Sequence, residues 1–144
     1  MPVALKRVYE EASRADGTRA LVDRLWPRGL SKDRAQVHTW FRELAPSNEL
    51  RKWFHAHQEA WPEFRKRYLK ELTRPDAADA LEKLHDLATG AKRVTLLFAS
   101  KDENRNNAVV LKELLEGMRK PPTGTGPGAI GTARMRQAAR RPRG

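Results

Sequence analysis

Short apolar runs and segments with helical spacing divide the chain into predicted strands and helices. Residues 3–9 and 19–25 are rich in strand-forming residues, and residues 94–99 form a run that is apolar except for Thr95 and is followed within two residues by the charged Lys101. A run of this last kind is typical of a strand buried on both faces, so we expect it to be the central strand of a sheet. The segment between the first two strands contains the turn signal Asp16-Gly17 and is too short for a crossover helix, which favours an antiparallel hairpin.

Apolar residues recur at helical spacing in four segments between the second and third strands. These stripes cover residues 37–44, 50–54, 61–72 and 80–88, and a fifth stripe over residues 108–118 follows the third strand. Ser31 or Asp33 is available as the N-cap of the first helix and Ser47 as that of the second. Pro46 ends the first helix, and Gly90 ends the fourth.

The predicted order of elements is β-β-α-α-α-α-β-α, which indicates a small α/β domain. We expect a sheet of three or slightly more strands, with the last strand central and parallel to the second, and with the helices packed on the sheet. Six aromatic residues on the helical stripes are expected to lie in the core: Trp40, Phe41, Trp53, Trp61, Phe64 and Tyr68.

Composition separates this domain, residues 1–118, from a basic tail, residues 119–144. The formal net charge is +11, but seven basic residues and no acidic ones lie in the tail, so residues 1–118 carry only +4. Nine of the 26 tail residues are Gly or Pro, and such a segment buries too little apolar surface to offset its ordering entropy. We therefore expect the tail to be disordered and the domain surface to be that of an ordinary soluble protein.

The absence of cysteine excludes disulfides, thiolate zinc sites and thiol nucleophiles. The first residues reach charge at Lys6, so they lack the apolar region of a signal peptide, and no later run approaches transmembrane length. A cytoplasmic location and no membrane partner are expected.

Two predicted loops carry the residues suited to chemistry. Residues 23–29 leave the second strand with Asp23, Arg24, Trp26 and Arg28, and residues 100–107 leave the third strand and open the last helix. Parallel strands place their carboxyl ends at one edge of a sheet, where ligands bind in open α/β folds, so we expect the two loops to converge.

This convergence predicts a pocket for a phosphate or a carboxylate. The start of a helix offers unpaired N–H groups, and Arg24, Arg28 and Lys101 supply positive charge for the same anion. Asp23 and Asp102 are then available as a base or a metal ligand.

A purely structural interpretation of the same residues is also open. Asp23 would pair with Arg24 or Lys101, Asp102 or Asn104 would cap the helix, and Arg28 would be solvated.

The four histidines do not suggest a metal site. His55 and His57 are two residues apart on a predicted helix and face different directions, while His38 and His85 have no obvious acidic partner. No cofactor or metal is expected.

Four blocks of sequence carry a family resemblance. They are Lys-Arg-Val-Tyr at residues 6–9, Leu-Val-Asp-Arg-Leu-Trp-Pro-Arg-Gly at 21–29, Ala-Pro-Ser-Asn-Glu-Leu-Arg-Lys at 45–52 and Thr-Leu-Leu-Phe-Ala-Ser-Lys-Asp at 95–102. Together they closely resemble the YeaO-like family of uncharacterised bacterial proteins, over residues 1–118. The resemblance implies a compact α/β domain in which these blocks are characteristic. The resemblance also implies a difference, since members of the family often carry His where this chain has Asn107. Without that histidine the chain lacks the natural general base of the loop, and we expect acid–base catalysis less than in those relatives.

Two functional hypotheses follow. The first is an anion pocket, for a phosphate, nucleotide or carboxylate, with candidate ligand-binding residues Arg24, Trp26, Arg28, Ser47, Lys101, Asn106 and Asn107 and, if a reaction occurs, catalytic candidates Asp23, Lys101 and Asp102. The alternative is nucleic-acid binding through the tail arginines Arg134, Arg136, Arg140, Arg141 and Arg143, aided by basic residues on the predicted helix at 61–72. An interaction module using Trp26 or Trp53 is a third possibility.

Overall fold

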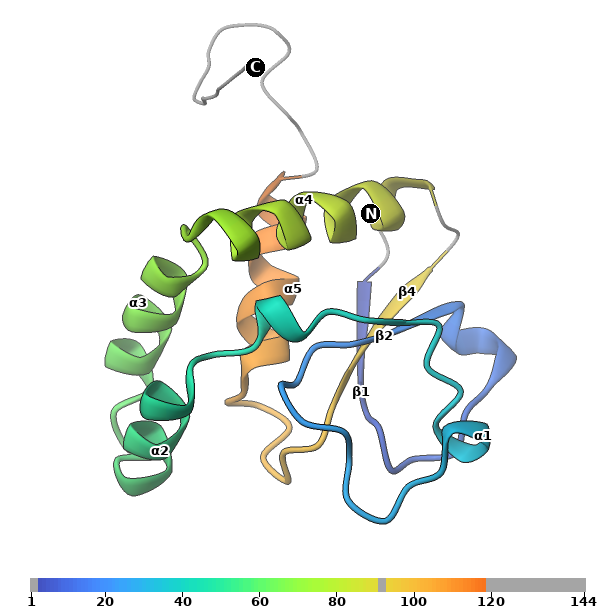
Figure 1. Cartoon of the computed structure of the whole chain (residues 1–144), viewed down its shortest axis with the longest axis horizontal. Helices are drawn as coiled ribbons and strands as arrows, with labels where there is room; N and C mark the ends of the chain where they lie inside the picture. The colour runs from blue at the N-terminus through green and yellow to red at the C-terminus, as the bar shows by residue number, and fades with distance from the viewer. Residues whose placement is uncertain (1–2, 91–92, 119–144) are drawn as a thin grey trace, which may run out of the picture.

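The structure is a computed structural model that describes residues 3–90 and 93–118, so the predicted tail lies outside the described residues. These residues form four strands, five α-helices and two short 3₁₀ turns, and Figure 1 shows how the labelled elements are arranged. Their bounds are β1 (Val3–Arg7), η1 (Arg14–Asp16), β2 (Thr18–Leu21), α1 (Lys32–Ala35), β3 (Thr39–Trp40), η2 (Arg42–Leu44), α2 (Asn48–Ala56), α3 (Trp61–Glu71), α4 (Pro75–Gly90), β4 (Val94–Phe98) and α5 (Asn107–Met118).

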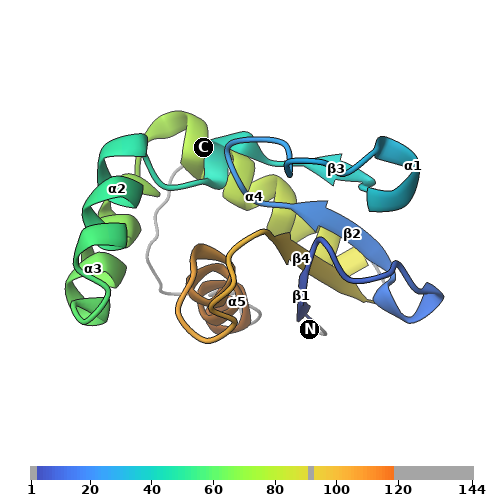
Figure 2. The ribbon, with the colours of Figure 1, turned by 90° about the horizontal axis from the view of Figure 1, so that it is seen from below.

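The sheet is entirely parallel, in the order β1-β4-β2-β3 (Figure 2). This confirms the α/β class and the central position of the last strand, parallel to the second. The predicted antiparallel hairpin is wrong, because β4 lies between β1 and β2. Residues 8–17 connect the end of β1 to the start of β2 without an α-helix. The connection must run back along β1, whose five residues span about 17 Å, and ten extended residues can cover about 33 Å.

Side chains on the two faces of the sheet enter different clusters. Ala20, Leu96 and Phe98 belong to the main core under α3, α4 and α5, whereas Leu21 and Leu97 point to the opposite face. This follows from the alternation of successive side chains along a strand. The second face is covered by α1 and by the segment around Trp26 and Trp40.

The predicted helix over residues 37–44 is wrong. Ser31 does cap a helix, by accepting from the Arg34 N–H, but α1 ends at Ala35 and Gln36 adopts a left-handed conformation (φ 46°, ψ 48°). The chain then forms β3, with Thr39 and Trp40 beside Ala20 and Leu21 of β2. The apolar residues at helical spacing divide between the two clusters, Val37 and Trp40 on one face and Phe41 and Leu44 in the main core. Such spacing in a short segment does not distinguish a helix from a strand.

The remaining helices and the central strand confirm the sequence prediction. Ser47 caps α2 by accepting from the Leu50 N–H, and α4 ends at Gly90. Of the six aromatic residues expected in the core, Phe41, Phe64 and Tyr68 are buried, while Trp40, Trp53 and Trp61 are half-buried. In the described ranges, 3–90 and 93–118, no helix has the length and apolarity needed to cross a membrane.

Candidate anion-binding pocket

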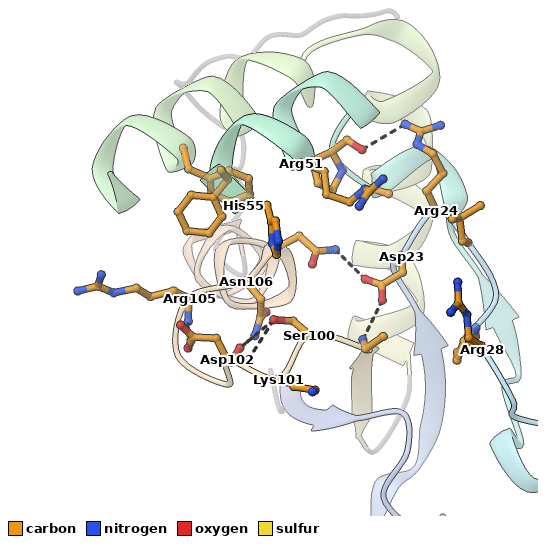
Figure 3. A pocket seen from close by; sticks show the side chains of 18 of the residues that line it. Asp23, Arg24, Arg28, Arg51, His55, Ser100, Lys101, Asp102, Arg105 and Asn106 are labelled. Atoms are coloured by element: carbon orange, nitrogen blue, oxygen red, sulfur yellow. Dashed lines mark hydrogen bonds between the residues drawn. The ribbon is translucent and has the colours of Figure 1, made fainter. Parts of the chain in front are cut away.

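Two loops that follow neighbouring parallel strands meet at the carboxyl edge of the sheet. Residues 22–30 leave β2, residues 99–106 leave β4, and together with α2 they surround a cavity of about 710 Å³. Arg51 and His55 approach it from α2, while Ser100, Lys101 and Asp102 lie on the opposite side (Figure 3).

The first loop is held in shape by its aromatic residue. The Trp26 indole N–H donates to the Leu30 carbonyl (2.7 Å), and its ring packs edge-on against Trp40 at 5.5 Å. Outside this turn, the Tyr9 hydroxyl donates to the Arg28 carbonyl (3.0 Å). The side chain of Arg28 is therefore presented by a backbone that is fixed from two sides.

The second loop turns around the carboxylate of Asp102. Its Oδ1 accepts from the N–H groups of Asn104 (2.9 Å) and Arg105 (3.0 Å). The N-cap of α5 is instead Asn106, whose Oδ1 accepts from the Val109 N–H (3.0 Å) while its amide donates to the Asp102 carbonyl (2.8 Å). Neither Asp102 nor Asn104 caps the helix. The buried Asn106 links the loop to the start of α5 through its two hydrogen bonds.

Asp23 lines the cavity, and within residues 3–90 and 93–118 it forms no ion pair, which contradicts its predicted pairing with Arg24 or Lys101. Its carboxylate accepts from the Ala99 N–H (2.8 Å) and from the Asn107 amide (3.3 Å) (Figure 3). Burial raises the pKa of the Asp23 carboxyl, and these two hydrogen bonds only partly counteract that effect.

Asn107 connects Asp23 to the interior. Its amide also donates to the Val22 carbonyl (2.8 Å), and it interacts with the phenol of Tyr68, which donates to the Leu44 carbonyl. Burial, followed by the nearby carboxylates of Asp23 and Glu71, raises the pKa of Tyr68 well above its ordinary value, so this phenol stays protonated. An amide at position 107 suits a static network, since it donates one hydrogen bond to a carboxylate without titrating.

Basic side chains surround the cavity in excess. Those of Arg24, Arg28, Arg51, Lys101 and Arg105 line it, against two acidic ones, Asp23 and Asp102, for a formal charge of +3 with His55 neutral. Arg24 donates to the Pro46 carbonyl at 3.4 Å. Across residues 3–90 and 93–118, the side chains of the other four cations make no hydrogen bond or ion pair with the protein.

The sequence-based set overlaps this lining without matching it. Arg24, Trp26, Arg28, Lys101, Asn106 and Asn107 all line the cavity, whereas Ser47 does not and instead donates its hydroxyl to Glu71 (2.6 Å). Arg51, His55 and Arg105 were missed. Arg51 and His55 lie four residues apart on α2 and share a face, but nothing in the sequence says that this face turns toward the two loops.

The other histidines lie outside the cavity. His38 Nδ1 accepts from the Arg19 N–H (2.8 Å), and the His57 ring stacks on Trp53 at 4.9 Å. Within the described part of the chain, no three His, Asp or Glu side chains gather closely enough to hold a metal ion.

The comparisons with known proteins point to a single group. A family profile described as the inactive DUF488-N3 subclade matches residues 2–124. The uncharacterized protein Rv3073c of Mycobacterium tuberculosis is 44% identical over 115 residues, which cover 80% of this chain and 94% of the relative. The uncharacterized protein YeaO of Escherichia coli is 40% identical over 118 residues, 82% of this chain and the whole of the relative. No solved structure matches the chain significantly.

Proposed function

Because this chain belongs to the inactive DUF488-N3 subclade, the family of the uncharacterized protein YeaO, we propose that it binds a small anion in the pocket between β2, β4 and α2 and does not transform it. The observation that carries the proposal is a set of four cations around one cavity whose side chains have no ion-pair or hydrogen-bond partner in the described part of the chain, namely Arg28, Arg51, Lys101 and Arg105. The subclade's description as inactive favours binding over turnover.

Electrostatics supports an anionic ligand over a cationic or neutral one. Cations from three different segments surround one concavity, where low-dielectric walls strengthen their combined field. Arginine donates two parallel hydrogen bonds to a phosphate or carboxylate, so Arg28, Arg51 and Arg105 are suited to clamp such a group. The polar groups around Asp23 have protein partners, which makes them less available for catalysis.

Removing the unpaired cations should weaken anion binding. We expect Arg28→Ala and Lys101→Ala each to lower the affinity for inorganic phosphate by about tenfold, because each loses a charge-assisted hydrogen bond. Isothermal titration calorimetry on the full chain measures this. The matched controls are Arg34→Ala on α1 and Lys52→Ala on α2, which remove equally exposed cations that do not line the cavity. Equal losses in all four variants would mean that the pocket is not the binding site.

The affinity should also depend on the protonation of Asp23. Since burial raises the pKa of this carboxyl, it takes up a proton at a higher pH than a solvated aspartate does, and its negative charge then leaves the pocket. We expect the affinity for sulfate, whose charge is constant in this range, to rise as the pH falls through the pKa of Asp23. In the Asp23→Asn variant the side chain at this position is neutral throughout this pH range, so its sulfate affinity should equal the one that the unmodified carboxyl gives when it is protonated.

Both proteins in that comparison carry His55→Gln, so that the histidine lining the cavity does not contribute to the difference between them. A profile that is the same with Asp23 and with Asn at that position would contradict the proposed role of this carboxylate.

Nucleic-acid binding by the tail stays a prediction, since residues 119–144 lie outside the described residues. The contribution expected from the basic residues of α3 is reduced. Arg65 pairs with Glu113 (3.0 Å), and Arg67 pairs with Glu63 (2.7 Å) while lying over the Trp53 ring. Half of the basic side chains on that helix are therefore neutralised within the domain.

A further inference from the structure

The large apolar side chains that remain exposed are concentrated at the pocket. Among the described residues, Tyr9 and Leu25 are the exposed large hydrophobic residues, 40% and 69% accessible, and both line the same cavity as the unpaired cations. Ligand pockets combine apolar and aromatic side chains with a few polar groups, so exposed apolar side chains inside a cationic cavity favour a ligand with an apolar part. An inorganic anion, which has no apolar surface, would leave both side chains in water.

Tyr9 is held in this exposed position by two contacts. Its hydroxyl donates to the Arg28 carbonyl, and the Arg7 guanidinium lies 5.3 Å from the ring centre. Arg7 in turn donates to the carbonyls of Ser100 (2.9 Å) and Ala99 (3.1 Å) in the second loop. The ring is thus fixed to both loops of the pocket, and its exposure reflects a preformed surface.

From this we infer that the pocket takes an organic anion whose apolar or aromatic body rests on Tyr9 and Leu25 while its charged group lies among the cations. Nucleoside monophosphates and aryl phosphates belong to this class. The inference rests on the proposed function and deepens it by naming the ligand class.

The size and layout of the cavity agree with such a ligand. Its volume of about 710 Å³ falls in the range of about 300–1,000 Å³ that holds drug-sized molecules. Tyr9 contacts the Arg28 backbone through its hydroxyl, and Arg28 and Arg105 lie at opposite ends of the view (Figure 3). A molecule that spans these ends needs a body between its charged group and its apolar contact.

A pair of ligands with equal charge tests the inference. 5′-AMP and ribose 5-phosphate carry the same phosphate but differ by an aromatic base, so any non-specific attraction to the basic tail affects both alike. We expect the full chain to bind 5′-AMP about tenfold more tightly in calorimetry, as one stacked base typically provides. Leu25→Ser should reduce that difference by weakening 5′-AMP binding more than ribose 5-phosphate binding, whereas Leu25→Met should retain it.

The outcomes separate the inference from the proposed function. If both ligands bind equally and lose affinity in Arg28→Ala, the anion site stands and the organic-body inference is overturned. If neither ligand responds to Arg28→Ala or Lys101→Ala, both fail. If Leu25→Ser changes only the oligomeric state, measured by sedimentation, the exposed leucine serves self-association and the inference is again overturned.

Discussion

Asp16→Ala is expected to lower the free energy of unfolding by about 3–5 kcal/mol. The Asp16 carboxylate pairs with the Arg19 guanidinium at 2.5 Å and with the Lys6 ammonium at 3.1 Å, and Arg19 is only 1% exposed. Arg19 also donates to the Ala35 carbonyl (2.7 Å), so its guanidinium is held in the interior. Removing the carboxylate leaves a buried positive charge without its counter-charge, and urea unfolding at neutral pH measures the cost.

The control is an exposed ion pair of similar geometry. Glu63 and Arg67 lie 2.7 Å apart with side chains 45% and 47% exposed, and Glu63→Ala should cost no more than about 1 kcal/mol. If the two variants lose the same stability, the buried pair at Asp16 contributes no more than a solvated one.

Acid should reproduce part of the Asp16→Ala effect. Burial by itself raises the pKa of Asp16, but hydrogen bonds from the Ser13 backbone and from Lys6 and Arg19 outweigh it, and the pKa is lowered. The resulting stabilisation is present above the ordinary pKa of an aspartate and is lost as the pH falls through the lowered value. Asp16→Ala should therefore lose less stability on acidification than the unmodified chain.

Gly17→Ala is expected to lower the free energy of unfolding by about 3 kcal/mol or more. Gly17 has φ 65° and ψ −135°, and an added Cβ would lie 2.3 Å from the Arg93 carbonyl oxygen. That backbone is fixed, because the Arg93 carbonyl accepts from the Thr18 N–H (3.0 Å) where β2 meets β4. The new methyl group must therefore displace the strand pairing, and thermal or urea unfolding detects the loss.

Gly29 provides the matched control, since it shares the positive φ (75°) but has open space where the Cβ would be. Gly29→Ala should cost only the conformational strain, about 1–2 kcal/mol. If Gly17→Ala lowers the free energy of unfolding by no more than this, the backbone where β2 meets β4 can shift at little cost.

Local signals predicted those elements whose own residues show a cap, an apolar stripe or a buried run. Ser47 and Leu50 mark the start of α2, the stripe through Phe64 and Tyr68 marks α3, and the largely apolar run 94–98 marks a strand with both faces buried. In each case the residue pattern expresses a requirement of the element itself, a cap or one apolar face.

The sequence predicted the parallel pairing of β2 with β4, but it missed β3 and wrongly paired the first two strands, because neither of these features follows from a local pattern. Thr39 and Trp40 form a strand only because β2 offers a free edge, and β1 and β2 run parallel only because β4, about 70 residues later in the chain, enters between them. Without β4 between β1 and β2, the segment that joins these two strands is equally compatible with a hairpin.

Some features of the pocket could likewise be predicted from the sequence, and others could not. The sequence alone indicated the two loops, the cations Arg24, Arg28 and Lys101, and a ligand site at the carboxyl edge of a parallel sheet, because the direction of a strand determines where its loop emerges. Only the tertiary structure decided that Arg51 and Arg105 join these cations, that Ser47 turns to Glu71, and that the exposed Tyr9 and Leu25 lie beside them. Those contacts depend on where α2, which packs on α3, and the segment after β1 lie relative to the two loops, and no short stretch of residues specifies this placement.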